Sequence, residues 1–305
     1  MRAVTGLYMS AVRSWLAELR PLSNLPEFDG SEQAQARQKE LAADFTAYRQ
    51  ADGPIWRSGA AAARATLDAV AGAASTVDAL VYVSENEADA VTVLPALLDD
   101  LGLDLATALA VSGHECGNLG PALNSAADAI TAGRAETVLV VLADHADDRG
   151  RLMDNGLSVF SDGAAAFLLG KDRPAGEHFE LLGVDVTRTP SAGSNLLATA
   201  RAAQGSVAGL LQRCNLTGGD VAAVAFANYR WDAQRFLAAA TRLPPEHVLR
   251  PDVADVAHCF SADVPVNLAG ALSDADQVSD GAAVLGLVTG PWSWSTIALR
   301  AHRGS

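Results

Sequence analysis

The chain has 305 residues, which is enough for two domains or for one large α/β body with an ample core. Half of the residues are hydrophobic and 19% are charged, a composition that excludes disorder, collagen and low-complexity repeats. The 36 acidic and 22 basic residues give a formal charge of −14, which disfavours general attraction to nucleic-acid phosphates or anionic lipids. We therefore expect neither a nucleic-acid nor a membrane partner.

The sequence also bears on where the protein is found. No apolar stretch approaches the roughly 20 residues that cross a bilayer, and charged residues interrupt the first twenty positions where a signal peptide would be apolar. The three cysteines, Cys116, Cys214 and Cys259, are far apart and odd in number, which fits reduced thiols better than a disulfide framework. A cytoplasmic protein is predicted.

Short β-rich runs alternate with alanine-rich helical stretches along most of the chain, the pattern of βαβ units around a largely parallel, buried sheet. In chain order we expect a helix at Ser58–Ala71, a strand at Ala79–Ser84, a helix at Val91–Leu101, a strand at Thr107–Ser112, a helix at Gly117–Ala132, strands at Thr137–Ala143 and Ala164–Leu169, a helix at Asn195–Arg213, a strand at Val221–Ala227, helices at Trp231–Arg242 and Val264–Leu272, and strands at Ala282–Val288 and Ser295–Leu299.

A polar connector at residues 170–178 separates two halves that contain comparable series of elements. VDALVYVS and AETVLVVLAD in the first half correspond to DVAAVAFAN and DGAAVLGLVT in the second. We interpret this as an internal duplication, with residues 1–170 forming the first half and residues 171–305 the second. Order of elements supports an architecture and does not by itself specify a function.

Cys116 is the candidate nucleophile. An apolar strand ends at Ser112 and Gly113, and Cys116 follows directly ahead of an amphipathic helix. A thiol at a helix N-terminus gains from the helix dipole and the unpaired N–H groups, which favour the nucleophilic thiolate. Glu115 and the apolar surroundings act in the opposite direction. The residues alone leave a second interpretation open, namely a small buried cysteine without chemistry.

The segment at residues 108–144 resembles the active-site region of the beta-ketoacyl-ACP synthase III branch of the thiolase-like condensing enzymes. That family shows C-x-G-x-x-x-A-L, then a V-V-x-x-D strand and then F-x-D-G-A-x-A. The matching residues here are Cys116, Ala122 and Leu123, with Asn118 in place of the usual Gly, then Leu139-Val140-Val141 through Asp144, and Phe160-Ser161-Asp162-Gly163-Ala164. The resemblance implies an α/β, thiolase-like fold, with two pseudo-duplicated βαβ halves in a layered α-β-α-β-α body.

The C-terminal residues 280–300 are similar to the closing hairpin of the same family, L-L-x-F-G-G-G-x-x-W-G, in which Gly290 and Trp294 match. In the family, a glycine of this turn and the catalytic cysteine lend their backbone N–H groups to an oxyanion hole. The resemblance therefore implies an oxyanion hole formed by the N–H groups of Cys116 and Gly290, which would stabilise the tetrahedral intermediate of acyl transfer.

Two further family motifs are altered. The family has a His in P-H-Q-A-N-x-R and an Asn in G-N-T-S-A-A-x-x-P, whereas residues 226–231 and 257–265 here place Asn228 at the His position and His258 at the Asn position. Both family residues donate hydrogen bonds to the malonyl thioester in decarboxylation, and the exchange changes their reach and tautomer. Simple acyl transfer asks only for a thiolate, an oxyanion hole and one general base, which Cys116 and His258 can supply.

Other polar residues near these motifs have simpler interpretations. Asp263 opens the last predicted helix and is most simply an N-cap or first-turn carboxylate. Asn228 could equally be a turn residue at a strand end, and His258 a hydrogen-bonded structural histidine. His114, two residues before Cys116, is a weaker candidate base. Residues 144–148, DHADD, are expected to form a solvated loop and no metal site, because zinc-like Cys/His spacing is absent.

Family members take acyl groups from coenzyme A or from acidic acyl carrier proteins, so the resemblance implies an acyl-CoA or an acyl-phosphopantetheine thioester as substrate and no permanently bound cofactor. Arg230, Arg235 and Arg242 lie in a net positive segment and are the candidate docking residues for carrier or coenzyme, unless they form an ordinary solvated helix face. The family also implies a homodimer that pairs through a strand near the nucleophile.

We therefore predict an acyltransferase of ketosynthase III type that moves an acyl group through a Cys116 acyl-enzyme to an acceptor in a specialised biosynthetic pathway. A decarboxylative synthase that forms a carbon–carbon bond is the first alternative. The second alternative is a non-catalytic partner subunit of a heteromeric synthase.

Overall fold

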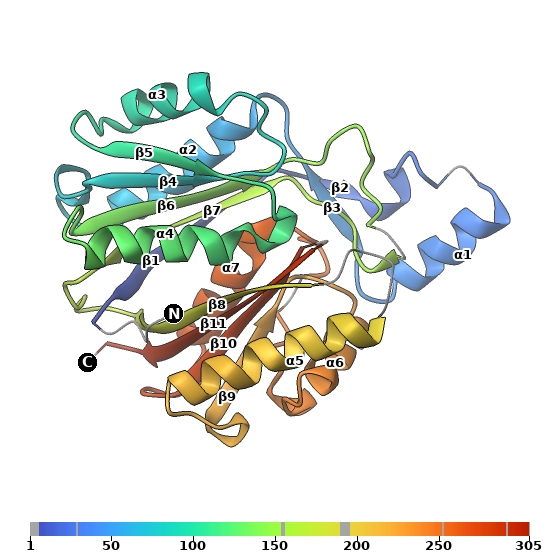
Figure 1. The fold of residues 1–305 in the computed structure, drawn as a ribbon. Helices are drawn as coiled ribbons and strands as arrows, with labels where there is room; N and C mark the ends of the chain where they lie inside the picture. Colours follow the sequence, from blue (N-terminus) through green and yellow to red (C-terminus); the bar gives the residue numbers. More distant parts are fainter. Residues whose placement is uncertain are drawn as a thin grey trace.

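A computed structural model describes residues 6–28, 30–153, 156–189, 196–251, 253–290 and 292–304. Nine strands form one sheet in the order β5-β4-β6-β7-β1-β8-β11-β10-β9, and β2 and β3 form a separate two-stranded sheet (Figure 1). Strands β4, β5 and β6 are parallel to one another, and β9 is parallel to β10, whereas β7, β1, β8 and β11 pair antiparallel.

The N-terminal part contains the strands β1 (Tyr8–Leu16), β2 (Glu18–Pro21), β3 (Ala47–Gln50), β4 (Ala79–Val83), β5 (Thr107–Val111), β6 (Thr137–Asp144) and β7 (Gly163–Gly170), with the helices α1 (Glu32–Leu41), α2 (Ile55–Asp68), α3 (Ala90–Leu101) and α4 (Leu119–Thr131). The C-terminal part contains β8 (His178–Arg188), β9 (Val221–Phe226), β10 (Ala283–Thr289) and β11 (Ser293–His302), with α5 (Leu196–Arg213), α6 (Trp231–Ala240) and α7 (Asp263–Ser273). Short 3₁₀ turns include η3 (Glu115–Asn118) and η7 (Phe260–Ala262).

The body is layered α-β-α-β-α, as predicted from the resemblance. Helices α2 and α3 cover the outer face of the β5–β7 part of the sheet, and α5 and α6 cover the outer face of the β8–β11 part (Figure 1). Helices α4 and α7 lie between the two parts, where α4 contacts β6 and β8 and α7 contacts β1, β9 and β10. Helix α4 is buried on both sides. Its alanine-rich sequence permits this, because small side chains let both parts of the sheet approach the helix.

Close approach is most evident at Gly120, in the first turn of α4. A Cβ placed there would lie 2.2 Å from the Ser295 hydroxyl oxygen on β11. Only glycine lets this helix pack so near the strand, and the same contact holds the residues just before the helix against the C-terminal hairpin. The position of Cys116 is thus fixed by packing between the two parts of the chain.

The seven strands and six helices expected from the sequence all occur, with ends that differ by a few residues. Asn195, the first residue of the predicted helix Asn195–Arg213, lies outside the described residues. The sequence interpretation missed β1, β2, β3, β8 and α1. Strand β1 interrupts its pattern with a bulge at Ala11, whose φ is 52°, and β8 lies in a stretch where alternation is weak.

Strand β1 joins the two parts of the sheet, because it pairs with β7 on one side and β8 on the other. Strand β7 ends at Gly170 and β8 begins at His178, so the expected connector lies between them. The division into duplicated halves at residue 170 stays a prediction. In the described part of the chain, no helix is both long and apolar enough to span a membrane.

Candidate active site

Cys116 lies in the 3₁₀ turn η3 between β5 and α4, and its side chain is buried, with 2% of the residue exposed. Glu115, directly before it, has φ 48°, in the left-handed region that non-glycine residues rarely adopt. Such strain persists only where surrounding contacts fix it, and it is common at functional sites. The turn is therefore held in a costly conformation that presents the Cys116 thiol.

Glu85, at the end of β4, supplies most of these contacts. One of its carboxylate oxygens accepts hydrogen bonds from Gly113 N at 2.7 Å, from Glu115 N at 3.1 Å and from Asn118 Nδ2 at 3.1 Å. Asn118, which replaces the family's usual glycine, accepts a further hydrogen bond from His114 N at 3.1 Å. The turn that carries Cys116 is thus held by hydrogen bonds to a residue that follows the neighbouring strand β4.

His258 is the hydrogen-bond partner of the thiol. Its Nε2 lies 3.0 Å from Cys116 Sγ, and the histidine is fully buried. The backbone of His258 pairs with the segment before β7. Its N–H donates to Val159 O at 2.9 Å, and its carbonyl oxygen accepts from Ser161 N at 2.8 Å. The structure therefore brings together Cys116 and His258, two of the residues singled out from the sequence.

The other ring nitrogen of His258, Nδ1, donates to Asp263 Oδ2. Because Nδ1 carries its proton toward the carboxylate, Nε2 is left to face the thiol, which is the arrangement of an orienting carboxylate, a base and a nucleophile. Cys116, His258 and Asp263 form a connected triad, although 142 residues separate the first two.

Asp263 lies in the first turn of α7, as one of the two interpretations of the sequence had it, but its carboxylate has a role that the sequence did not indicate. It is the first residue of α7, but the helix has no side-chain cap, and the carboxylate does not act as one. Instead it accepts hydrogen bonds from His258, from Cys259 N at 2.8 Å, and from Asn228 N at 2.8 Å and Nδ2 at 3.1 Å. Sequence reasoning missed this role because the intervening turn η7, with Phe260 at φ 53°, reverses the chain toward His258.

The charge of the triad follows from its burial and its partners. Burial lowers the pKa of His258, but the negative charges and hydrogen bonds of Cys116 and Asp263 outweigh burial and raise this pKa to about 10. The imidazole is therefore protonated at neutral pH. A protonated histidine 3.0 Å from sulfur stabilises the thiolate.

Asn228 lies beside the triad but is turned to Asp263. Its amide nitrogen donates to Ala257 O at 2.8 Å as well as to Asp263, and its amide oxygen accepts from Asn267 Nδ2 at 2.8 Å. Both amide hydrogens are engaged, so no donor remains for a substrate. The geometry makes Asn228 a positioning residue for Asp263, and the direct role expected from the sequence has no support here.

The predicted oxyanion hole is only half available. No hydrogen bond to a described residue is made by Cys116 N–H, which lies in the turn before α4, but Gly290 N–H donates to Ser293 O at 2.9 Å within the β10–β11 hairpin. Glycine is required at position 290 because a Cβ would lie 2.0 Å from His114 O. The hairpin thus packs directly on the turn that carries Cys116, while the N–H of Gly290 donates within the hairpin.

A pocket of about 490 Å³ opens onto Cys116. Its lining is mainly apolar and aromatic. The large residues of this kind are Leu152, Met153, Leu157, Phe160, Tyr229, Phe236, Leu237 and Phe260. Polar groups gather near its rim, where Arg149, 67% exposed in its side chain, lies 3.7 Å from Glu115. An apolar chamber with a nucleophile in its wall and a polar rim suits an acyl group carried on a polar thioester.

Comparisons with known proteins bear on the fold and on the segment around Cys116. Residues 112–189 match the family model of 3-oxoacyl-[acyl-carrier-protein] synthase III, and this range contains Cys116. No curated protein sequence matches the chain. The chain is similar in structure to ChlB3, named as an acyltransferase, with 20% identity, 98% of both chains covered and a TM-score of 0.82.

Two other solved structures are similar over the whole length. The 3-oxoacyl-(acyl carrier protein) synthase III FabH from Pseudomonas aeruginosa PAO1 has 23% identity, a TM-score of 0.78 and coverage of 98% of this chain and 99% of its own. A variant of OleA from Xanthomonas campestris has 17% identity, a TM-score of 0.78 and the same coverage. The chain therefore has the thiolase-like fold of these proteins, and the match to the synthase III family model is confined to residues 112–189.

Other candidates in this synthase III-like chain do not join the triad. The ring of His114 packs on Trp292, with 4.2 Å between ring centroids, and the thiol's partner is His258. The loop expected at residues 144–148 is only partly solvated, since Asp144 and His145 are buried and His145 Nε2 pairs with the Ser58 hydroxyl at 2.8 Å. No group of metal-binding side chains occurs among the residues that the structure describes.

The candidate docking arginines lie on or beside α6. Arg230 precedes the helix and pairs with Asp232 at 2.9 Å and Glu40 at 3.4 Å. Arg235 on the helix and Arg242 just past its end are both exposed. Phe236, next to Arg235, is 51% exposed and also lines the pocket at Cys116. A role in docking stays a prediction, although the helix lies at the pocket mouth.

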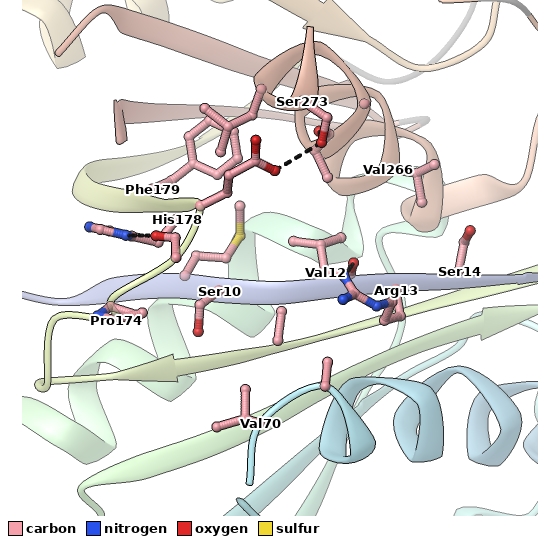
Figure 2. A pocket seen from close by; sticks show the side chains of 18 of the residues that line it. Ser10, Val12, Arg13, Ser14, Val70, Pro174, His178, Phe179, Val266 and Ser273 are labelled. Carbon is pink, nitrogen blue, oxygen red and sulfur yellow. Dashed lines mark hydrogen bonds between the residues drawn. The ribbon is translucent and has the colours of Figure 1, made fainter. Parts of the chain in front are cut away.

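A second, larger pocket of about 770 Å³ lies between β1, α7 and the end of α2 (Figure 2). Some of its polar groups are paired with one another: Ser273 donates to Glu177 at 2.9 Å, and His178 Nδ1 donates to Gly176 O at 2.6 Å. Figure 2 shows these side chains around strand β1, and no cysteine lines the pocket. The pocket that opens onto Cys116 is therefore the smaller one.

Proposed function

We propose that the protein is an acyltransferase that works through an acyl-enzyme on Cys116. The observation that carries the proposal is the hydrogen-bonded triad of Cys116, His258 and Asp263, whose Cys116 lies in the wall of an apolar pocket. The similarity in structure to ChlB3, named as an acyltransferase, supports it. The acyl donor is a thioester of coenzyme A or of a carrier protein, as the local match to 3-oxoacyl-[acyl-carrier-protein] synthase III suggests.

In the first half-reaction, the Cys116 thiolate attacks the carbonyl carbon of the thioester, and the carbonyl oxygen becomes an oxyanion. Cys116 N–H, at the start of a helix, is a donor for this oxyanion. When the intermediate collapses, the acyl group stays on Cys116 sulfur, and the pantetheine thiol leaves with the proton of His258. No outside co-reactant is needed.

In the second half-reaction, neutral His258 removes a proton from the acceptor, which is a hydroxyl, an amine or a carrier thiol, while Asp263 stabilises the imidazolium that forms. The acceptor then attacks the acyl-enzyme, and Cys116 returns to the thiolate. Each step uses a group whose position the structure fixes.

Decarboxylative condensation is disfavoured by the same geometry. It requires two donors at the malonyl thioester carbonyl, and here both amide hydrogens of Asn228 are engaged with Ala257 O and Asp263, which leaves His258 Nε2 as a single donor once Cys116 is acylated. We expect malonyl-CoA to release no carbon dioxide above the uncatalysed rate. The connected triad equally disfavours a non-catalytic partner subunit.

The test is intact-mass measurement after incubation with a panel of acyl-CoA and acyl-carrier thioesters. A gain of one acyl group in the native chain, absent in Cys116→Ala, supports the acyl-enzyme and identifies the donor class. Retention of the adduct in Cys116→Ala, or carbon dioxide release from malonyl-CoA by the native chain, would overturn the proposal. Cys214→Ala is a matched control, because that thiol lies just past the C-terminal end of α5 and donates to Leu182 O at 3.6 Å.

We also propose a homodimer that pairs through β5. This strand ends the sheet, and Leu109 on it is 39% exposed, with Leu105 just before it 96% exposed. An unpaired apolar edge is a template for antiparallel pairing with a second copy. Sedimentation should show a dimer, and Leu109→Lys should shift it toward monomer; a monomeric native chain would contradict the pairing.

A further inference from the structure

Tyr229 has a buried hydroxyl without a hydrogen-bond partner among the described residues. The residue is 3% exposed, lines the pocket beside Cys116, and its ring centroid lies 5.4 Å from that of His258. Leaving a buried polar group unpaired costs on the order of 1–3 kcal/mol. Such a group calls for an explanation, and a ligand that enters the pocket provides one.

The site is also short of a donor. Acyl-transfer sites commonly direct more than one donor at the developing oxyanion. Here the N–H of Gly290 donates to Ser293 O, and the amide hydrogens of Asn228 donate to Ala257 O and Asp263. Cys116 N–H alone is left from the backbone, and the unpaired phenol of Tyr229 lines the same pocket.

We propose that the Tyr229 hydroxyl is the second oxyanion donor of this site. It donates a hydrogen bond to the former carbonyl oxygen while the Cys116 sulfur–carbon bond forms, and the bond is released when the carbonyl re-forms and the thiol leaves. No proton is transferred from the phenol. The inference rests on the proposed acyl-enzyme and adds a catalytic residue to it.

The surroundings keep the phenol in the form that donates. Burial and the negative charges on Cys116, Asp263 and Glu115 raise the pKa of Tyr229 well above its ordinary value. The hydroxyl therefore keeps its proton at any working pH. The aromatic wall formed with Phe160 and Phe260 keeps water away, which strengthens a hydrogen bond to the oxyanion.

The experiment compares Tyr229→Phe with Tyr82→Phe. Both changes remove one hydroxyl from a buried ring, but Tyr82 lies in the separate core between β4 and α2. Single-turnover acylation by the most reactive acyl-CoA is followed by rapid quench and intact mass. Alkylation of Cys116 by iodoacetamide is measured alongside, because it needs the thiolate but forms no oxyanion.

We expect Tyr229→Phe to slow acylation by roughly 100-fold, the loss typical of one oxyanion donor, and to leave alkylation within about twofold. Tyr82→Phe should change neither rate. Equal loss of acylation and alkylation in Tyr229→Phe would overturn the inference, since it would mean that the hydroxyl supports the thiolate. A loss confined to transfer onto the acceptor would overturn it too.

The two proposals fail separately. If no thioester acylates the native chain, the proposed function fails and the role of Tyr229 with it. If the native chain is acylated and Tyr229→Phe is acylated as fast, only the oxyanion role of Tyr229 is refuted. Thermal unfolding of each variant shows that a lost rate is not a lost fold.

Discussion

Replacing Asp263 by asparagine tests the triad most directly. The carboxylate accepts four hydrogen bonds, two on each oxygen: Oδ2 from His258 Nδ1 and Asn228 N, and Oδ1 from Asn228 Nδ2 and Cys259 N. Asparagine has the same shape, but its amide nitrogen accepts nothing. Whichever way the amide turns, two buried donors lose their acceptor and the negative charge beside His258 is gone.

The size of the effect follows from these contacts. Two unpaired buried donors cost about 1–3 kcal/mol each, so the free energy of unfolding should fall by about 2–6 kcal/mol. Loss of the orienting carboxylate of a triad typically slows catalysis by about 10⁴-fold, which corresponds to roughly 5 kcal/mol in the activation free energy. The acylation rate of Asp263→Asn should fall by about that factor.

The pH dependence adds a second readout. Asp263 helps to raise the pKa of His258 to about 10, so without it the buried imidazole loses its proton at a lower pH. The thiolate then loses its cationic partner at a lower pH than in the native chain. The pH of half-maximal Cys116 alkylation by iodoacetamide should therefore move upward in Asp263→Asn, a value that belongs to the coupled pair.

The assay measures acylation by intact mass, alkylation against pH, and urea unfolding. Asp128→Asn is the matched control, because it makes the same change on an exposed position of α4 and should leave all three unchanged. A folded Asp263→Asn that acylates at the native rate would refute the reasoning. It would mean that His258 orients and charges itself without the carboxylate.

Other predictions concern stability. Burial raises the pKa of Asp144 to about 7, although hydrogen bonds to its carboxylate oppose the shift. Between about pH 4 and 7 the native chain therefore holds a proton that the unfolded chain has lost, so the free energy of unfolding should fall as the pH rises through this window. In urea titrations, Asp144→Asn should flatten this fall. Asp162→Ala leaves Arg151 without its buried ion pair, so the free energy of unfolding should fall by about 3–5 kcal/mol. A fall of less than about 1 kcal/mol would contradict this prediction. Gly120→Ala should lower the unfolding temperature by several degrees because of the contact with β11, whereas Gly205→Ala, in open space on α5, should keep or raise it.

Much of the fold could be predicted because local pattern and tertiary structure agree. Strand β6 is apolar throughout and buried, and α4 carries its apolar residues at helical spacing. The position of Cys116 at the end of a strand and the start of a helix followed from the same pattern. Where local pattern and tertiary structure disagree, the prediction failed. Strand β1 is an example, because it bears Arg13 and has a bulge at Ala11.

The remaining site residues could not be predicted because their partners are distant or hidden by local turns. Glu85 lies 28 residues before Gly113 in sequence, and only the parallel pairing of β4 with β5 brings it to the nucleophile turn. Asp263 follows His258 by five residues, a spacing with no periodic meaning outside a helix, and two left-handed residues, Ala257 and Phe260, make the contact possible. A carboxylate shortly after a candidate base is the one signal that was present.

The exchange of residues between the two family motifs becomes intelligible from these contacts. A histidine at position 258 reaches the thiol because Asp263 lies behind it, and the asparagine at position 228 uses its whole amide to hold that carboxylate. In our proposal, His258 is one base with an oriented, charged support, in place of the family's pair of donors for an enolate. The oxyanion is then left to Cys116 N–H and, on our proposal, to Tyr229. Acyl transfer needs no more than this, whereas decarboxylation needs the donors that the arrangement has given up.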